Sequence, residues 1–309
     1  MSVAEEKIKP IVEEIPSKGK LWYAAIKPPM YTVAVIPICF GTALAYGETG
    51  IFNPLIFVTF LFSAILIIAW LNLSNDFFDS YTGIDVNKAH SVVNLTGNAP
   101  LIFWISNICL ALGLMGIIMI NLWLGDWTVM GLIFACCFLG YTYQGPPFRF
   151  GYLGLGEIIC FITFGPMAIA SAYYSQAQNF SVSSLWASVL IGISTSIILF
   201  CSHFHQVEDD IKAGKKSPIV RLGTANGAKV LTTSTLVFYG LCILFTFLHL
   251  LPYSSLIVFL SLPPAIKMIN HVHENHDRPS LVQNSKFIAV KYHFFSGLLL
   301  SVSLILNNR

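Results

Sequence analysis

Nine runs of apolar residues, each about as long as a membrane-crossing helix, constrain the fold of this 309-residue chain most strongly. They lie at 29–46, 52–74, 100–123, 126–143, 154–174, 183–204, 228–250, 253–270 and 288–306. A helix needs about 20 apolar residues to cross roughly 30 Å of hydrocarbon. Charged residues make up 10% of the chain, whereas soluble domains carry about a quarter. We therefore predict an all-α, multi-pass membrane protein with nine transmembrane helices.

Three details refine this division of the chain. Residues 1–28 mix glutamates with lysines and contain no apolar signal segment, so we predict a solvated N-terminal arm before one transmembrane domain at 29–309. Pro263 and Pro264 interrupt the eighth run, which predicts a kinked or broken helix. The seven cysteines lie inside apolar runs without disulfide or metal-ligand spacing, so they indicate neither kind of site.

The basic residues indicate the orientation of the chain. With nine crossings, the N-terminal arm and the loops after the second, fourth, sixth and eighth helices share one side of the membrane. Sixteen of the 17 lysines and arginines lie there or at the adjoining helix ends, and only Arg309 lies on the other side. Because cytoplasmic loops are enriched in basic residues, we predict a cytoplasmic N-terminus. The sequence leaves open the oligomeric state and the choice between a plasma and a thylakoid membrane.

Two connections on this side exceed twenty residues, at 75–99 and 205–227, and we expect these cytoplasmic loops to cap a central cavity. The first follows directly from the second helix in the stretch NLSNDFFDSYTGID, residues 72–85. Carboxylates beside a spanning helix are functional candidates, since charge at membrane depth is costly. If the helix continues, four polar side chains share one face at i, i+3, i+4 and i+7, namely Asn72, Asn75, Asp76 and Asp79. Gly83 would end this helix and turn Asp85 back toward them.

A second acidic stretch, SHFHQVEDDIKAGKKSPIVRLG, follows the sixth helix at 202–223. It adds three carboxylates, Glu208, Asp209 and Asp210. Oxygen ligands of this kind suit Mg²⁺, which proteins bind through a few carboxylates together with substrate phosphates. Lysine and arginine are the natural partners of phosphate oxygens, and the candidates on this side are Lys27, Arg149, Lys212 and Lys215. The two stretches together predict a Mg²⁺-dependent diphosphate site.

Other functional classes fit the sequence less well. An ion-coupled transporter would also carry intramembrane charges, but here the acids lie at helix ends on one side and no matched pair of interrupted helices is present in the sequence. A CDP-alcohol phosphotransferase would need D-x-x-D-G-x-x-A-R, whereas Ser80 and Tyr81 follow Asp79. No basic cluster or zinc spacing indicates nucleic-acid binding, so the predicted partners are small substrates and the lipid bilayer.

The two acidic stretches resemble the motifs of the UbiA superfamily of intramembrane prenyltransferases. NDFFD is similar to the first motif of that family, N-x-x-x-D with further aspartates, and QVEDDIKAGK to the second, D-x-x-x-D followed by Gly-Lys. The resemblance spans most of the chain, since KPP with PICFGTALAY resembles the first helix and YLGLGEIICFITFGPMA the fifth. TGID, LTGN and the GLGE and FGP pattern resemble the MenA branch, the 1,4-dihydroxy-2-naphthoate prenyltransferases, and HFHQVEDD its cyanobacterial and plant phylloquinone form.

This resemblance implies Mg²⁺-dependent transfer of a phytyl or geranylgeranyl group from its diphosphate to 1,4-dihydroxy-2-naphthoate, with loss of the acceptor carboxylate, in phylloquinone or menaquinone biosynthesis. Other aromatic acceptors, such as homogentisate and chlorophyllide, are alternatives within the family. Aromatic faces near the motifs would stabilise an allylic cation, and the candidates are Phe78, Tyr141 and Tyr143.

The second motif departs from the family pattern at one position. Gln206 stands where the family usually has the first aspartate, while Asp210 keeps the second. Either Glu208 or Asp209 would supply the missing charge, or this half of the site would bind metal with fewer anions. His203 and His205 have no cysteine partner nearby, so we expect them to make ordinary hydrogen bonds beside the motif.

Overall fold

The computed structural model describes residues 18–82, 84 and 91–307, and every regular element in that part of the chain is helical. Eight helical segments there are long and apolar enough to cross a membrane. A ninth, α6 (Thr128–Gln144), is apolar but only 17 residues long. Each predicted run coincides with one of these segments, so the all-α, multi-pass prediction is confirmed, with the count of nine depending on α6.

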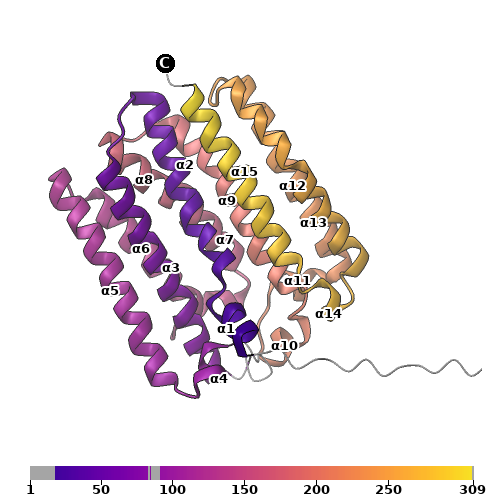
Figure 1. The fold of residues 1–309 in the computed structure, drawn as a ribbon. Helices are drawn as coiled ribbons and strands as arrows, with labels where there is room; N and C mark the ends of the chain where they lie inside the picture. The colour runs from indigo at the N-terminus through magenta and orange to yellow at the C-terminus, as the bar shows by residue number, and fades with distance from the viewer. Residues whose placement is uncertain (1–17, 83, 85–90, 308–309) are drawn as a thin grey trace, which may run out of the picture.

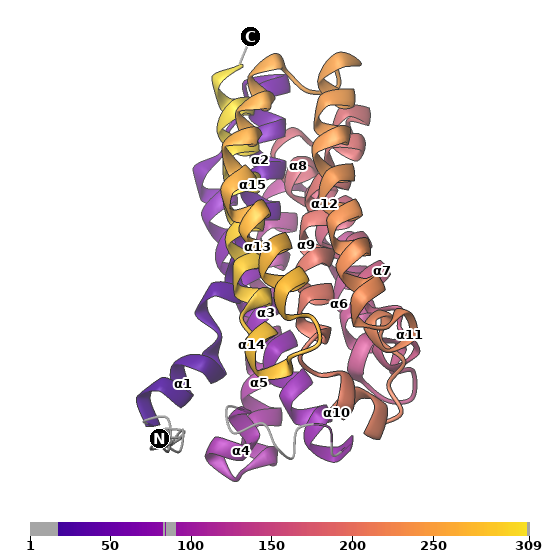
Figure 2. The same ribbon diagram turned by 90° about the vertical axis from the view of Figure 1, so that its right-hand side faces the viewer.

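The long helices run side by side along one axis of the molecule (Figures 1 and 2). The N-terminal half comprises α1 (Lys18–Ile26), η1 (Pro28–Tyr31), α2 (Thr32–Thr49), α3 (Pro54–Thr82), α4 (Val92–Thr96), α5 (Ala99–Leu124), α6 and η2 (Phe150–Leu153). The middle of the chain forms α7 (Gly156–Ile162), η3 (Thr163–Met167), α8 (Ala168–Ala177), α9 (Val182–His203), α10 (Val207–Lys212) and α11 (Pro218–Leu222). The last elements are α12 (Thr224–Phe247), η4 (Tyr253–Ser261), α13 (Leu262–Asn275), α14 (Pro279–Val282) and α15 (Ser285–Leu306).

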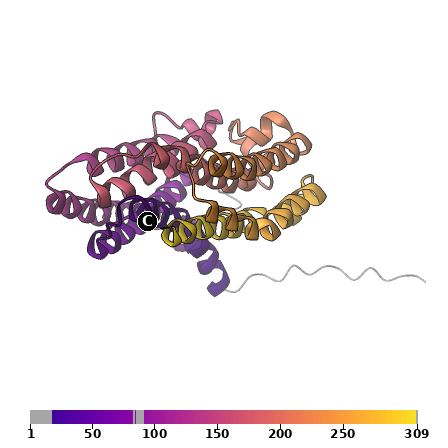
Figure 3. The same ribbon diagram turned by 90° about the horizontal axis from the view of Figure 1, so that it is seen from above.

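The short helices α1, α4, α10 and α14 gather at one end of the bundle, and the C-terminus lies at the other (Figures 1 and 2). We call the first of these the motif end, because the end of α3 and α10 carry the two acidic stretches there. The two acidic stretches, although far apart in sequence, therefore lie at the same end of the molecule. Seen from above, the N-terminal helices occupy one side and the C-terminal helices the other (Figure 3).

Two buried apolar clusters hold the bundle together. One joins side chains of α2, α9, α12, α13 and α15, and the other joins α3, α5 and α6 with parts of α2 and α8. Helices also approach closely at glycines, as is usual in membrane bundles. A Cβ added to Gly165 would lie 2.9 Å from the Gly192 Cα, so η3 and α9 pack there almost backbone to backbone.

The fifth and eighth runs are not continuous α-helices. Within the fifth, η3 is a π-helical turn that contains Pro166, and such turns are frequent at functional sites. Within the eighth, η4 is a 3₁₀ helix and α13 begins after it, with Pro263 and Pro264 in the first turn of α13. The predicted break is therefore present, but just ahead of the prolines, where a missing N–H costs no helical hydrogen bond.

Candidate active site

The first acidic stretch continues α3, so the condition for its polar residues to share one helix face is met. Helix α3 runs to Thr82, well beyond the apolar run, so Asn72, Asn75, Asp76 and Asp79 all lie on its last three turns. The side chains then separate: Asn72 and Asn75 line a central cavity, whereas the two aspartates contact neighbouring segments. Gly83 and Asp85 lie outside the described residues.

Asp76 is buried and bound from two sides. The Lys27 Nζ lies 3.2 Å from Asp76 Oδ1, and the backbone N–H of Val92 donates to Oδ2 at 3.1 Å. Lys27 has a left-handed backbone between α1 and η1, which aims its side chain at α3. Asp76 therefore connects the end of α3 to Lys27, which precedes η1, and to Val92, which begins α4.

Asp79 faces α6, where the Gln144 amide donates a short hydrogen bond to Asp79 Oδ1. One turn later on α3, the Tyr152 hydroxyl donates to Thr82 Oγ1 at 2.8 Å. Gln144 is the last residue of α6, and Tyr152 lies in η2, within the connection from α6 to α7. That connection, which is rich in Gly and Pro, therefore lies directly against the first acidic stretch.

The same connection also holds the second acidic stretch. The Lys216 N–H donates to the Tyr152 carbonyl at 2.8 Å, and the Arg221 guanidinium donates to the Leu153 carbonyl at 2.6 Å. Gly154, at φ 76°, makes this approach possible, because a Cβ there would lie 2.3 Å from the Lys216 carbonyl oxygen. Residues 144–155 thus bridge the two acidic stretches.

Asp210 is the fully buried carboxylate of the second stretch. Its Oδ1 lies 3.4 Å from the Lys215 Nζ and its Oδ2 lies 3.3 Å from the His203 Nδ1. The other ring nitrogen of His203 lies 3.4 Å from Glu157 Oε1 on α7. Burial alone would raise the pKa of the Asp210 carboxyl, but the contact with His203 and the charge of Lys215 lower it below its ordinary value.

The other predicted residues of the second stretch lie further out. The Glu208 side chain is 80% exposed and pairs with Lys212, 70% exposed, at 3.9 Å, the arrangement of a solvated surface pair. Asp209, His205 and Gln206 are half-buried around the start of α10, where Gln206 is the N-cap residue. Arg149 also has a left-handed backbone, and its Nε is buried without a hydrogen bond among the described residues.

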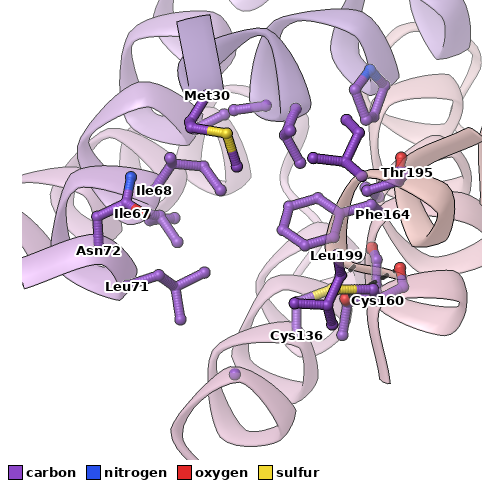
Figure 4. Close-up of a pocket in the computed structure, with 18 of the residues that line it drawn as sticks. Met30, Ile67, Ile68, Leu71, Asn72, Cys136, Cys160, Phe164, Thr195 and Leu199 are labelled. Carbon is purple, nitrogen blue, oxygen red and sulfur yellow. Dashed lines mark hydrogen bonds between the residues drawn. The ribbon is translucent and has the colours of Figure 1, made fainter. Parts of the chain in front are cut away.

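A central cavity of about 240 Å³ opens between α2, α3, α6, α7, η3 and α9 (Figure 4). Its deeper wall is apolar, with Phe60, Ala64 and Ile67 from α3. Toward the motif end its wall becomes polar, with the following side chains: Asn72, Asn75, Tyr143, Ser202 and Lys286. A long apolar group therefore fits along the bundle, with a polar group held at the motif end.

The three aromatic candidates do not share this cavity. Tyr143 lines it, whereas Phe78 and Tyr141 line a separate cavity of about 260 Å³ beside α5. Their rings meet edge to face at 5.9 Å between centroids. Of the three, only Tyr143 is placed to face a group bound in the central cavity.

Sequence reasoning missed several residues that organise the site. Glu157 and Lys286 are charged residues at the ends of apolar runs. A charge in such a position indicates a functional residue, so the sequence did contain a sign of their role. Gln144, Tyr152 and Arg221 lie in or against the α6 to α7 connection, and their role depends on tertiary packing that local sequence does not reveal.

Side chains of the described residues would supply only some of the ligands of a Mg²⁺ ion. No group of three or more His, Cys, Asp or Glu side chains able to hold a metal ion occurs within 18–82, 84 and 91–307. The oxygen donors on the end of α3 are the amides of Asn72 and Asn75 and the carboxylates of Asp76 and Asp79. The Asn72 Nδ2 is buried without a hydrogen bond, so its amide is oriented by packing in the cavity wall. Such donors fit Mg²⁺, which prefers oxygen and takes remaining ligands from phosphate and water.

Comparison with known proteins relates the chain to one protein family. Residues 34–298 match the UbiA prenyltransferase family. The chain is 61% identical to 2-carboxy-1,4-naphthoquinone phytyltransferase of Synechocystis sp., over 93% of each chain. It is 41% identical to the chloroplastic enzyme of that name from Arabidopsis thaliana, over 95% of this chain and 79% of that one. A solved UbiA homolog from Archaeoglobus fulgidus bound to GPP and Mg²⁺ shares the fold, with a TM-score of 0.59 at 16% identity over 92% of this chain and 99% of that one.

Proposed function

The chain belongs to the UbiA prenyltransferase family, and on that premise we propose that it transfers a phytyl group from phytyl diphosphate to 1,4-dihydroxy-2-naphthoate, with loss of the acceptor carboxylate. The observation that carries this proposal is that the central cavity is apolar along α3 and polar at the motif end. The names of the two phytyltransferase relatives support the donor and the naphthalene acceptor. Their acceptor name is that of the quinone, which is the two-electron oxidised form of the same carboxylic acid.

The cavity dimensions support a long donor chain. From Asn75 to Phe60 the cavity follows fifteen residues of α3, or about 22 Å at the helical rise per residue. The isoprenoid chain lies against the apolar wall of α3, and its diphosphate lies at the motif end. The apolar lining of this space disfavours water around the allylic cation that forms when the C–O bond breaks.

We infer that the residues of α3, together with Asp210 of the second acidic stretch, hold the metal and the diphosphate. Bound Mg²⁺ supplies Lewis-acid stabilisation of the charge that develops on the leaving diphosphate. Asn72, Asn75 and Asp79 offer oxygen ligands from the cavity wall and the following turn, and the archaeal homolog bound to GPP and Mg²⁺ supports this choice of ion. Lys27 and Lys215 contribute positive charge from opposite sides of the site, each beside a buried carboxylate.

The acceptor ring then attacks the cation. Tyr143 presents an aromatic ring to the cavity and can stabilise the cation through its face. Phe78 and Tyr141 have no such access from the outer cavity, so we propose Tyr143 alone for this role. Transfer ends when the ring carbon that bears the carboxylate has formed its bond to the prenyl group and released CO₂.

The test is transfer by the purified protein in detergent with Mg²⁺. Phytyl and geranylgeranyl diphosphates would be offered with 1,4-dihydroxy-2-naphthoate, with its quinone form, and with homogentisate and chlorophyllide as competing acceptors. We expect the prenylated 1,4-dihydroxynaphthalene, which air oxidises to the prenylated naphthoquinone during extraction, and one diphosphate per turnover, both abolished by EDTA. Product with homogentisate or chlorophyllide alone would contradict the acceptor, and the absence of diphosphate release with every pair would favour an ion-coupled transporter.

We also propose that the motif end faces the cytoplasm. Sixteen of the 17 basic residues belong to that side under the predicted topology, which is the usual bias of cytoplasmic loops. In a variant without the seven native cysteines, single cysteines placed at exposed Glu274, near the motif end, and at exposed Phe180, at the opposite end, would be tested for labelling in intact cells with an impermeant maleimide. Labelling of residue 180 and not of residue 274 is expected, and the reverse would overturn the orientation.

A further inference from the structure

The second acidic stretch delivers a single fully buried carboxylate to the site. Asp210 is buried, whereas Glu208 is 80% exposed and paired with Lys212 at the surface. Gln206 lies four residues before Asp210, on the same face of the turn that opens α10, but it is neutral. Helix α10 therefore contributes less negative charge than its run of three acids suggests.

Another carboxylate lies close by, on a different helix. Glu157 in the first turn of α7 places Oε1 3.4 Å from the His203 Nε2, and the His203 Nδ1 is 3.3 Å from Asp210 Oδ2. The Glu157 side chain is only 17% exposed, and both of its carboxylate oxygens are buried. The Ser196 hydroxyl donates to the Glu157 carbonyl at 2.8 Å, which fixes the backbone of this turn against α9.

We propose that Glu157 is the second carboxylate of this half of the site, and that it acts through His203 as a positioning residue for Asp210. The inference deepens the proposed prenyltransferase function and rests on it. His203 lies between two carboxylates, one on each ring nitrogen, so the ring orientation depends on both. Removal of the Glu157 charge would free the ring and with it the Asp210 carboxylate, whose other oxygen faces Lys215.

The expected change in metal affinity is taken from other metal sites in which a neighbouring residue orients a ligand. Residues that orient a metal ligand from behind typically change metal affinity by about 10- to 100-fold when they are replaced. We therefore expect Glu157→Gln to weaken binding of Mn²⁺ in the presence of inorganic diphosphate by at least about tenfold. The KM for the donor should rise by a similar factor, while kcat at saturating donor and metal should change by less than about threefold.

The measurement is Mn²⁺ binding by electron paramagnetic resonance, with the full chain in detergent and inorganic diphosphate as the probe. Glu274→Gln is the matched control, because it makes the same chemical change at an exposed carboxylate near the motif end. Glu157→Asp should retain most of the affinity, since it keeps the charge. His203→Asn should weaken Mn²⁺ binding as Glu157→Gln does. The double variant should bind Mn²⁺ no more weakly than either single variant, since Glu157 acts on Asp210 only through His203.

A compensating variant separates this role from simple structural support. In Glu157→Gln combined with Gln206→Asp, the new carboxylate lies one turn before Asp210, and we expect Mn²⁺ affinity to return to within about threefold of the wild type. A packing defect at α7 would not be repaired by a charge on α10. Unchanged Mn²⁺ affinity in Glu157→Gln, or a loss that Gln206→Asp does not repair, would overturn the inference while wild-type transfer stands. Absence of both Mn²⁺ binding and transfer in the wild type would overturn the proposed function as well.

Discussion

The Tyr152 hydroxyl donates a hydrogen bond to Thr82 Oγ1 at 2.8 Å, and this contact fastens the end of the first acidic stretch to a connection 70 positions away in the sequence. The carbonyl of the same tyrosine accepts a hydrogen bond from Lys216 of the second stretch. Tyr152 therefore links both halves of the site through one residue. The relative position of the two acidic stretches depends on it.

Replacement of Tyr152 by Phe should weaken this link without removing the ring. A neutral hydrogen bond contributes about 1 kcal/mol, so we expect the KM for the donor to rise about three- to tenfold. Thr82→Val should have a similar effect, and the double variant should lose little more than either single variant. The measurement is steady-state kinetics, with Tyr253→Phe, an exposed tyrosine at the opposite end, as control. Fully additive losses would contradict the link.

Asp79 should be indispensable for turnover. It lies one turn beyond the cavity-lining Asn75, and Gln144 holds its carboxylate through one oxygen. Asp79→Ala should lower kcat/KM by at least about 10²-fold, as expected for a group that helps stabilise developing charge, while the protein still inserts and purifies normally. The matched control is Asp277→Ala, at an exposed carboxylate. Wild-type turnover in Asp79→Ala would remove Asp79 from the metal site.

Much of this architecture could be predicted from the chain alone. The apolar runs predicted the helices, because each is long enough to cross the lipid as a helix that satisfies its backbone hydrogen bonds internally. The i, i+3, i+4, i+7 spacing places four polar residues on one face if the helix continues, and α3 does extend through the first acidic stretch. What periodicity could not show is that the two aspartates of that face turn toward different neighbours, Lys27 and Gln144, while the two asparagines face the cavity.

The second stretch was less predictable for a related reason. A run of three acids gives no indication of which one is buried, since α10 is too short for a repeating pattern. The structure buries Asp210 and exposes Glu208, because α10 follows directly on α9 and carries Asp210 toward His203 and Lys215. The contribution proposed for Glu157 depends on how α7 and the following η3 pack against α9, where Gly165 of η3 meets Gly192, a contact between residues distant in sequence.

The Lys27 and Asp76 pair should stabilise the motif end. Both side chains are largely buried, so Asp76→Ala would leave an ammonium with little water and without its carboxylate partner. We expect a loss of about 3 kcal/mol in the free energy of unfolding. Lys27→Met combined with Asp76→Ala should recover most of that loss, as uncharged side chains leave no unpaired ion. Unfolding in detergent measures both variants, and a double variant less stable than Asp76→Ala alone would contradict the pairing.

The environment of Asp210 predicts a specific dependence of stability on pH. Burial alone would raise the pKa of the Asp210 carboxyl, but His203 and Lys215 favour the carboxylate form. The pKa therefore lies below its ordinary value of 3.8. The stabilisation is therefore complete well above pH 3.8 and is lost as the pH falls through that value toward the lower folded pKa. The difference in thermal stability between wild type and Asp210→Asn should shrink as the pH falls below about 4. Asp277→Asn, at an exposed carboxylate, should show no such change, and a difference that shrinks as pH rises would contradict the direction.

The apolar wall of the cavity should determine which donor chains are accepted. Ala64 lines that wall three turns of α3 deeper than Asn75, about 16 Å from it along the helix. Ala64→Phe would fill the cavity beyond this point, so we expect kcat/KM for phytyl diphosphate to fall at least about tenfold while geranyl diphosphate, whose chain ends before the new ring, loses less than about threefold. Leu61→Phe, on the same helix but outside the cavity lining, is the control for a larger side chain. If both donors lost activity equally, the isoprenoid chain would have to follow another path, because steric exclusion at one depth acts only on chains long enough to reach it.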